Sequence, residues 1–452
     1  MPRNGETGRY KRYEACLNKS LCLYKPVAKI IIENSDVVAR VCNYVLGPGL
    51  NGFILWVLNE AINSGKVRLY FLARDGYLMY QSAKIFCEKL KLPIECRYLS
   101  CSRYSIRIPM FHLEPDEALE YICRGGINVN MKKILNRSGL SAAEQAEVLD
   151  GLNLNIEMNE VIPYARLDEI RSALKMNQSF IKYMCDRSKE AMPNLVGYFK
   201  QEGLLDKVDY AIVDSGWVGS MQKTLNQLIA FMGEERKLEG YYWGLYELPP
   251  GAVRIEYHCY YFKPEGSLKE KVHFSNCLFE VIFSAPHGMT LRYEKTGEGY
   301  RPCYDRTSDE KRKFIEKTET CLIKYTEVMA AAVNSLDEID YQRDKAVIKK
   351  LFGLFMGKPV KDEVEVYGNC MFSDDVLEDE QQPLAAILNE KELKENHVLN
   401  KVLVMFGIKK AQIKESAWYE GSAVRNGQAT GWHVIQYAIY KYLLYVRKMI
   451  CK

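Results

Sequence analysis

The sequence predicts an α/β protein with a mainly parallel sheet, a helical insertion between the two halves of that sheet, and a helical C-terminal region. Two segments, residues 67–103 and 209–246, have the order strand, turn, helix, strand. A helix between two strands favours their parallel pairing. The residues between these segments, 114–205, and most of residues 296–452 have apolar positions at helical spacing.

Length and composition exclude several classes of protein. The chain has 452 residues, enough to bury a substantial core, and its formal net charge of +4 argues against nucleic acid as a partner. Its 14 cysteines form no CxxC pair and no zinc-type spacing with the six histidines. The N-terminus lacks a secretory apolar segment, and no apolar run reaches the roughly 18 residues of a membrane span. We therefore expect a cytoplasmic protein with reduced thiols.

Residues 1–60 are expected to form an N-terminal helical arm that packs on the core. Residues 1–20 are basic and polar, which favours a loosely packed start of the chain. Apolar positions recur at helical spacing in residues 27–62. Within them, the sequence GPGLNG at 47–52 predicts a break between two helices that cover the first strand.

The first half of the sheet is expected in residues 61–113, where an apolar strand, a charged turn, a helix and a second strand follow one another. Charged residues at the carboxyl ends of parallel strands stand where open α/β sheets bind ligands. Two arginines and a carboxylate there predict an anionic, metal-chelated ligand. The segments are the strand 67–72, the turn Arg74, Asp75 and Gly76, the helix 77–90, and the strand 96–100 with Ser102 and Arg103 after it.

Residues 206–295 are expected to form the second half of the sheet, beyond the insertion, which we predict to be a hood over the site. Small residues in the first turn of this half let backbone N–H groups point inward at the start of a helix, a combination that suits a phosphate. The expected segments are the strand 210–213, the turn of Asp214, Ser215, Gly216, Trp217, Val218, Gly219 and Ser220, the helix 221–231, and the strands 238–246 and 255–262.

Glu280 lies within an apolar segment, and a polar loop with Ser284 and His287 follows it. An acidic residue in such a segment must be paired, protonated or hydrated. Glu280 is therefore a candidate site residue, with a structural hydrogen bond as the alternative. His287 is a weaker candidate, since a loop histidine is more often incidental than catalytic.

The C-terminal region, residues 296–452, is predicted to be mainly helical, with an acidic stretch at 374–380 and a loop at 416–428. Its last segment, 432–452, places apolar residues on one stripe and ends with basic residues. We expect this segment to dock on the core; a basic amphipathic surface for an anionic membrane is the alternative. The stripe consists of Trp432, Ile435, Ile439, Tyr442, Leu443 and Val446.

One known activity is excluded by a single residue. The sequence FLARDGYLM is superficially similar to the opening signature of the haloacid-dehalogenase phosphatases, but their nucleophilic aspartate would fall on Ala73. Without that aspartate no aspartyl-phosphate can form.

The two turns together resemble those of type I phosphoribosyltransferases. The strand, Asp214, the small-residue turn and the helix are similar to the diphosphoribose-binding loop of those enzymes. RDG at 74–76 is similar to their pyrophosphate loop, and SR at 102–103 to the start of their catalytic loop. Ser215 stands in place of the usual second acidic residue, and GWVGS in place of the usual Thr-Gly-x-Thr cradle, which sets the chain apart from the nucleotide-salvage enzymes.

In combination, the signatures FLARDGYLM, YLSCSR, VDSGWVGSMQ, FEVIFSAPHG and AWYEGS, within residues 70–422, most resemble the phosphoribosyltransferase-like family of bacterial surface-polysaccharide clusters. The resemblance implies a type I phosphoribosyltransferase-like fold. It implies transfer of ribofuranosyl 5-phosphate from phosphoribosyl diphosphate (PRPP) to a hydroxyl of a lipid-linked glycan, in capsule or O-antigen synthesis. It further implies Mg²⁺ bound mainly through the donor phosphates, with Asp75 as a candidate ligand, and a separate phosphatase that acts on the product.

The resemblance also implies roles for individual residues. The amides of residues 216–220 and the Ser220 hydroxyl would bind the 5-phosphate, and Asp214 would accept hydrogen bonds from the ribose hydroxyls. Arg74, Asp75 and Arg103 would stabilise the leaving pyrophosphate. The base that takes the hydroxyl proton of the acceptor could be Asp75, Asp214 or Glu280. The implied donor site comprises Arg74, Asp75, Gly76, Ser102, Arg103 and residues 214–220, and the implied acceptor site comprises Glu280, Ser284, His287, Trp418 and Glu420.

Two other functions remain open. If Arg74 and Asp75 form a salt-bridged strand end and residues 214–220 a packing turn, the chain would be a non-catalytic scaffold of a glycan-assembly complex. A glycosyltransferase that uses a nucleotide sugar would need a base-binding pocket and commonly a DxD-type metal site. Asp374 and Asp375 in the acidic stretch are the nearest candidates for that site.

Overall fold

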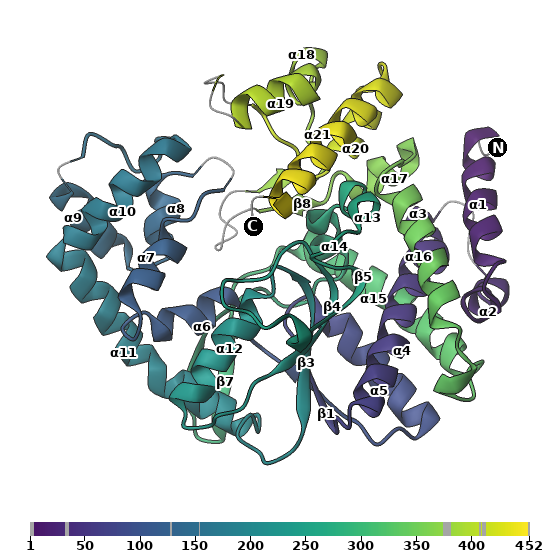
Figure 1. Ribbon diagram of the computed structural model, residues 1–452, viewed down its shortest axis with the longest axis horizontal. Helices are drawn as coiled ribbons and strands as arrows, with labels where there is room; N and C mark the ends of the chain where they lie inside the picture. The colour runs from purple at the N-terminus through teal and green to yellow at the C-terminus, as the bar shows by residue number, and fades with distance from the viewer. Residues whose placement is uncertain are drawn as a thin grey trace.

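The protein is built on a five-stranded, all-parallel sheet with the strand order β2-β1-β3-β4-β5 (Figure 1). The computed structural model describes residues 4–31, 36–126, 129–152, 154–373, 381–405, 408 and 413–450. The sheet confirms the α/β class and the parallel pairing expected from the sequence. Its strands are β1 (Arg68–Leu72), β2 (Glu95–Leu99), β3 (Tyr210–Trp217), β4 (Glu239–Leu245) and β5 (Tyr257–Phe262).

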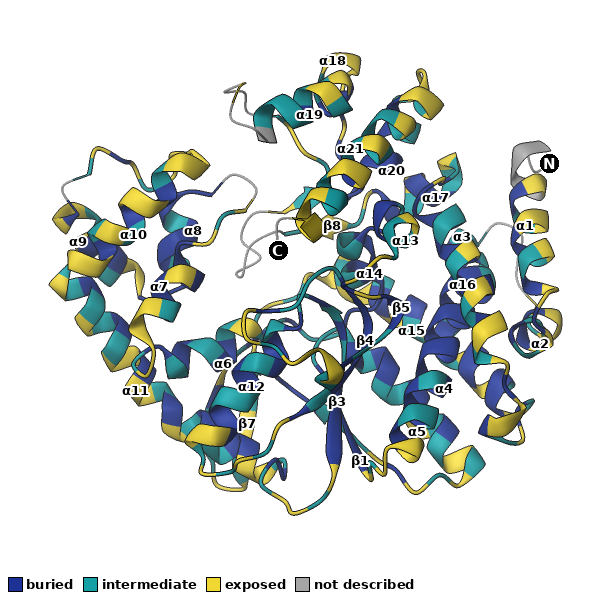
Figure 2. Ribbon diagram, in the orientation of Figure 1, coloured by how far each residue is buried: buried dark blue, intermediate teal, exposed yellow. Residues whose placement is uncertain are grey.

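Helices cover both faces of the sheet because successive side chains of each strand point to opposite sides. Leu69 and Phe71 of β1 join one core, and Tyr70 and Leu72 join the other. Figure 2 shows that the buried residues are concentrated in the strands and on the inner sides of these helices. The first core is shared with α4 (Gly47–Asn63), α5 (Gly76–Leu90), α15 (Asp309–Ala330) and α16 (Tyr341–Phe355), and the second with α6 (Arg103–Met110), α11 (Gln178–Gln201) and α12 (Ser220–Phe231).

The sequence GPGLNG does not break the helix that contains it, contrary to our expectation. The chain is helical from α3 (Val37–Val41) through a π-helical turn, η1 (Cys42–Leu46), to the end of α4. Its glycines allow close helix packing, since a Cβ on Gly49 would stand 2.4 Å from a ring carbon of Phe352. Among the described residues, Val37–Asn63 is the one helix long and apolar enough to cross a membrane, but 89% of its most apolar window is buried in the fold, as in a core helix.

The start of the chain is helical and held by a buried ion pair, rather than loosely packed. The described part begins with α1 (Asn4–Leu17) and α2 (Leu21–Lys29). Arg9 of α1 donates to both carboxylate oxygens of Glu363 at 3.2 and 3.1 Å, and the Tyr13 hydroxyl donates to the same carboxylate at 2.6 Å. Glu363 belongs to α17 (Lys361–Tyr367), so this pair joins the N-terminal arm to the C-terminal region.

The insertion between β2 and β3 forms a helical lobe beside the sheet (Figure 1). It has a hydrophobic core of its own, with members from Ile108 to Met184. Glu117 of the lobe accepts hydrogen bonds at 3.2 Å from Lys223 and from Gln227 on α12. Besides α6 and α11 the lobe contains α7 (Pro115–Ile122), α8 (Met131–Asn136), α9 (Ala142–Gly151), η2 (Tyr164–Arg166) and α10 (Leu167–Met176).

After the sheet and two short helices the chain forms a β-hairpin that was not predicted from the sequence. Strands β6 (Thr290–Thr296) and β7 (Gly299–Tyr304) pair antiparallel and pack on α11. The rest is mainly helical, as expected, and the acidic stretch 374–380 with Asp374 and Asp375 lies outside the described residues. The remaining elements are η3 (Arg254–Glu256), α13 (Leu268–Val272), α14 (Asn276–Ile282), η4 (Leu336–Glu338), β8 (Met371–Phe372), β9 (Gln382–Pro383), α18 (Glu390–Glu395), α19 (Val398–Met405), α20 (Tyr419–Asn426) and α21 (Thr430–Ile450).

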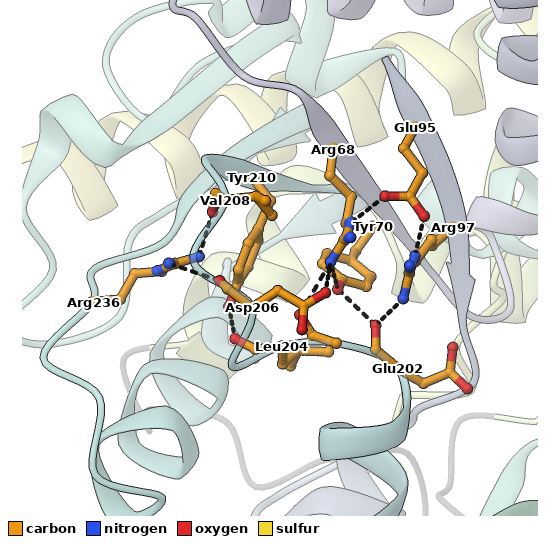
Figure 3. Close-up of polar contacts among 11 residues, drawn as sticks. Arg68, Tyr70, Glu95, Arg97, Glu202, Leu204, Asp206, Val208, Tyr210 and Arg236 are labelled. Atoms are coloured by element: carbon orange, nitrogen blue, oxygen red, sulfur yellow. Dashed lines mark hydrogen bonds and ion pairs between the residues drawn. The ribbon is translucent and has the colours of Figure 1, made fainter. Parts of the chain in front are cut away.

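Charged groups at the amino ends of the strands are paired with one another and with main-chain carbonyls (Figure 3). Arg68 donates to Glu95 at 2.5 Å and to Asp206 at 2.7 Å. Arg97 also donates to Glu95, at 2.6 Å, and to the carbonyl of Glu202, at the end of the insertion, at 2.6 Å. This network ties the insertion to β1 and β2 and is structural, because the charges neutralise each other.

Candidate functional site

A cavity of about 640 Å³ opens at the opposite edge of the sheet, beyond the carboxyl ends of β1, β2, β3 and β4. Open α/β sheets bind their ligands at this edge. Most of its lining comes from three parts of the chain: the loops of the sheet with α14, the insertion, and α21. Met289, Thr290, Phe372 and Ser373 complete the wall. The lining residues used below are Arg74, Asp75, Ser102, Arg103, Asp214, Ser215, Gly216, Trp217, Val218, Ser220 and Glu280 from the first part, Tyr121, Arg124, Gly125, Gly126 and Arg137 from the insertion, and Leu444, Tyr445 and Lys448 from α21.

The two predicted turns meet in this cavity through Ser215. Its hydroxyl donates a short hydrogen bond to Asp75, and its backbone N–H donates to Asp214 at 2.9 Å. Burial raises the pKa of Asp75, and burial together with the negative charge of Asp75 raises the pKa of Asp214 to about 7. Ser215 therefore links two carboxyl groups, one through its hydroxyl and the other through its backbone N–H.

A third carboxyl group, Glu280 on α14, faces the same two aspartates. The indole N–H of Trp217 donates to Glu280 at 2.6 Å. Burial and the charge of Asp75 raise the pKa of Glu280 to about 7, while Arg103 and the indole oppose the shift. Trp217 has a φ of 71°, in the left-handed region that a tryptophan rarely adopts, so the surrounding fold holds the indole in place at a cost in backbone strain.

The turn before α12 is shorter than the sequence suggested. We expected the turn to begin at Asp214, but β3 continues through Trp217, because Asp214, Gly216 and Trp217 stay in register with β4. Only Val218 and Gly219 separate the strand from the helix. With residues 214–217 in the strand, the backbone N–H groups that a helix N-terminus offers at this point are those of the first turn of α12, near Ser220.

The N-terminus of α12 suits an anion. The helix has 12 residues, and its N-cap is Gly219, which has a φ of 69° and no side chain to accept from the first amides. Ser220 and Met221 line the cavity, so the positive end of the helix dipole lies at its wall. Gly219 and Gly76 themselves are not part of the wall: a Cβ on Gly219 would stand 2.8 Å from Tyr257, and one on Gly76 would stand 3.0 Å from the Phe71 main chain.

Arginines from two parts of the chain line the cavity. Arg74 and Arg103 follow β1 and β2, and their charges oppose the rise in the pKa of Asp75. Arg124 and Arg137 come from the insertion. Arg137 donates to the carbonyls of Ile122, at 3.2 Å, and Arg124, and so shapes the loop that carries Arg124. The positive charge fits an anionic ligand.

Ser102 lines the cavity but also has a structural role. Its hydroxyl donates to the carbonyl of Thr290 at 2.6 Å and caps α6 by accepting from the N–H of Ser105 at 2.9 Å. A bound ligand would therefore compete with these two contacts for the hydroxyl.

Four of the five acceptor-site predictions lie outside the cavity wall. His287 contacts the Tyr98 hydroxyl at 2.8 Å and stacks on Tyr304, and burial lowers its pKa. Trp418 donates to the carbonyl of Met356 at 2.8 Å inside the core, and Glu420 is buried in an ion pair at 3.5 Å from Lys441. Ser284 is buried as well. Only Glu280 of this group reaches the cavity.

The sequence predicted the insertion as a hood over the site, but it did not indicate which residues of the insertion or of α21 line the cavity. The loop between α7 and α8 contains Arg124, Gly125 and Gly126, which line the cavity. A basic residue beside two glycines is the sequence pattern that could have identified this loop as part of a site. The local sequence around Tyr445 and Lys448 does not mark them as site residues, since they lie in a regular helix. Tyr445 stacks on Tyr246 at the end of β4, with ring centroids 5.4 Å apart.

The described residues contain no group of three or more histidine, cysteine or carboxylate side chains placed to hold a metal ion. The chain matches no protein-family model, and it matches no curated protein.

Proposed function

We propose that this protein is a glycosyltransferase that moves ribofuranosyl 5-phosphate from PRPP to a hydroxyl of a glycan and releases pyrophosphate. One observation carries the proposal: Asp75, from the turn after β1, and Asp214, from the end of β3, are linked through Ser215 in one cavity, beside the N-terminus of α12. The resemblance to the phosphoribosyltransferase-like family of surface-polysaccharide clusters supports the same reaction. In that setting the enzyme would act in the cytoplasm on a lipid-linked capsule or O-antigen precursor.

The donor fits the polarity of the cavity. The 5-phosphate would bind the first amides of α12 and the Ser220 hydroxyl, and Asp214 would accept hydrogen bonds from the ribose hydroxyls. Arg74 and Arg103 would contact the pyrophosphate at the ends of β1 and β2. Their positive charge would stabilise the negative charge that develops on the leaving group.

The reaction breaks the bond between ribose C1 and the pyrophosphate oxygen and forms a bond from C1 to the acceptor oxygen. The hydroxyl proton of the acceptor must move to a base. Glu280 is the best placed of the three carboxyl groups, because Trp217 orients it and its pKa of about 7 suits proton transfer at neutral pH. Asp75 and Asp214 are engaged by Ser215 instead.

Magnesium fits the site as a partner of the donor. Asp75 and Asp214 raise the free energy of each other's ionised form, and a bound cation would relieve that repulsion. Asp75 is the first candidate for a protein ligand. When bound, Mg²⁺ would neutralise charge on the pyrophosphate.

The direct test is calorimetric titration of the protein with PRPP and Mg²⁺, followed by incubation with PRPP and a panel of synthetic or lipid-linked glycans. We expect saturable donor binding and a product that gains one phosphopentose by mass spectrometry. No PRPP binding by the folded chain would favour the scaffold function. A product from a nucleotide sugar, with none from PRPP, would assign the nucleotide-sugar reaction.

Arg103→Gln separates chemistry from binding. Because the charge on the leaving group develops only in the transition state, the variant should lose about 10²-fold in turnover with a smaller change in the Kd of PRPP. Arg254→Gln, which removes an exposed partner of Glu265 outside the cavity wall, is the matched control and should keep full turnover. A weaker Kd of PRPP with unchanged turnover would place Arg103 in ground-state binding only.

A further inference from the structure

The apolar stripe of α21 faces solvent instead of the core. Helices on a protein surface normally turn their apolar side inward. Here the outer stripe, defined as Trp432, Ile435, Ile439, Tyr442 and Leu443, has exposed fractions between 42% and 56%. Its members recur at spacings of three and four residues, so they form one narrow, continuous face of the helix.

The opposite side of α21 makes the contacts with the rest of the protein. Tyr437 stacks on Tyr419 of α20, with ring centroids 4.2 Å apart, and Tyr445 stacks on Tyr246 at the sheet. Lys441 is buried against Glu420. The helix is therefore already docked through aromatic and charged side chains, and of the outer stripe Trp432 adds one edge-on ring contact, with His397 at 6.3 Å between centroids.

The charge of α21 indicates what would cover the outer stripe. Thr430–Ile450 contains no aspartate or glutamate, and its basic residues are Lys441, Arg447 and Lys448. Arg447 is exposed at the C-terminal end, and Lys448, also exposed, lies 3.5 Å from Glu247 on the side of the helix that lines the cavity. Trp432 and Tyr442 are the residue types that prefer the boundary between lipid headgroups and acyl chains. A helix with these properties fits an anionic lipid surface.

We propose that α21 is an interfacial helix that holds the protein on an anionic phospholipid bilayer through its outer stripe. A second copy of this chain is the less suitable occupant. A symmetric contact through the same stripe would pair two helices that both lack carboxylates, so Arg447 would find no opposite charge on the partner helix.

Membrane docking would also orient the cavity. Leu444, Tyr445 and Lys448 of the same helix line its wall, so the cavity lies within about one helix diameter, roughly 10 Å, of the outer stripe. A substrate anchored in the bilayer would enter without leaving the surface. The inference itself does not depend on the proposed reaction, because it concerns lipid binding alone.

The test is flotation of the full chain with two kinds of vesicle. One is phosphatidylcholine alone, and the other contains about 30% phosphatidylserine, an anionic fraction that attracts basic helices. We expect the wild type to float with the anionic vesicles. The fraction that floats with the neutral vesicles should be at least about fivefold smaller, which is the contribution of one basic side chain near an anionic surface. Ile435→Ser/Ile439→Ser/Leu443→Ser should lower binding at least tenfold, since it removes most of the aliphatic stripe.

The matched control is Tyr164→Ser/Met176→Ser, which removes two side chains that are 82% and 81% exposed on the insertion. It should float like the wild type. Thermal melting checks that both variants fold. The proposal is overturned if the folded wild type does not float with anionic vesicles, if the triple variant floats as well as the control, or if sedimentation shows a dimer that the triple variant abolishes while no lipid binding is seen.

Discussion

Asp214 has to carry its charge next to that of Asp75 whenever both are ionised. Burial and this neighbour raise the pKa of Asp214 from 3.8 to about 7, so the folded chain binds its proton more tightly than the unfolded chain does. The stability that this proton provides is full below about pH 4 and is lost as the pH rises through about 7. The site therefore stores unfavourable free energy at neutral pH, as functional sites often do.

Asp214→Asn should stabilise the protein, and more at high pH than at low pH. The asparagine side chain is uncharged at every pH, whereas Asp214 becomes charged as the pH rises. The gain in the free energy of unfolding should therefore be at least about 1 kcal/mol larger at pH 8 than at pH 5. Urea denaturation at the two pH values measures the difference. Asp209→Asn, exposed at the start of the same strand, is the control and should change stability equally at both. A gain of equal size at both pH values would show that Asp214 is not strained.

Trp217 affects Glu280 through one hydrogen bond, and its removal should be visible in a pH profile. The indole N–H favours the ionised form of Glu280 and so lowers its pKa. Trp217→Phe should raise that pKa and move the acid limb of kcat/KM for the transferase reaction to higher pH. Trp432→Phe, on the surface, should leave the limb in place. An unchanged acid limb in Trp217→Phe would remove Glu280 from the role of base.

At the scale of single elements, the helix α3-η1-α4 shows how glycine can serve packing. Gly47, Gly49 and Gly52 lie on a helix that touches Tyr325, Phe352 and Ile348. Their cost in helix propensity, up to about 1 kcal/mol each, is offset by the close approach they allow.

Gly49→Ala should therefore destabilise the protein by about 2 kcal/mol or more, although alanine is the better helix former. The new methyl group would overlap the buried Phe352 ring. Gly353→Ala is a matched control in α16, where a Cβ meets nothing within 4 Å, and it should be neutral or stabilise by up to about 1 kcal/mol. Thermal and urea unfolding of both variants give the comparison. Stabilisation by both substitutions would mean that GPGLNG is not tightly packed.

The strand β3 illustrates the opposite case, in which a predicted turn became regular structure. Residues 214–217 contain a charge, a small residue and a glycine, which favour a turn locally. In the fold the neighbouring strand β4 offers main-chain partners for these residues, and Asp214 and Trp217 point into the cavity from a rigid element. A site on a strand holds its side chains more firmly than one on a loop.

For the whole molecule, the cavity depends on three parts of the chain that are far apart in sequence. PRPP with Mg²⁺ should therefore slow amide hydrogen exchange in residues 121–126, 214–221 and 444–448 together, since one ligand would bury all three. Exchange in residues 164–176, outside the cavity wall, should not change. Protection confined to 214–221 would contradict a ligand that spans the cavity.

Most of the sheet could be predicted from the sequence, because its signals are local. Apolar runs of strand length, the turns around Asp75 and Asp214, and helical spacing in α5 and α12 all depend on residues close in the chain. Glu280 was recognisable for a similar reason, since a carboxylate in an apolar segment needs an explanation. The resemblance to known loops then linked the two turns to one ligand.

Other features depend on contacts between distant residues. The packing of α1 on the fold involves the Arg9–Glu363 pair, and the packing role of Gly49 involves Phe352. The motif residues Trp418, Glu420 and His287 belong to the interior or to its polar contacts, which their local sequence does not show.

By itself, then, the sequence determined the α/β class, the parallel order within each unit and the candidate residues of the sheet loops. These follow from hydrophobic spacing and turn chemistry over a few residues. Only the tertiary structure decided that Ser215 links two carboxyl groups, that Arg124 and Lys448 join the same cavity, and that the outer stripe of α21 is left in solvent. Each of these is a relation between segments distant in the chain, and it exists only once folding has set which faces are buried.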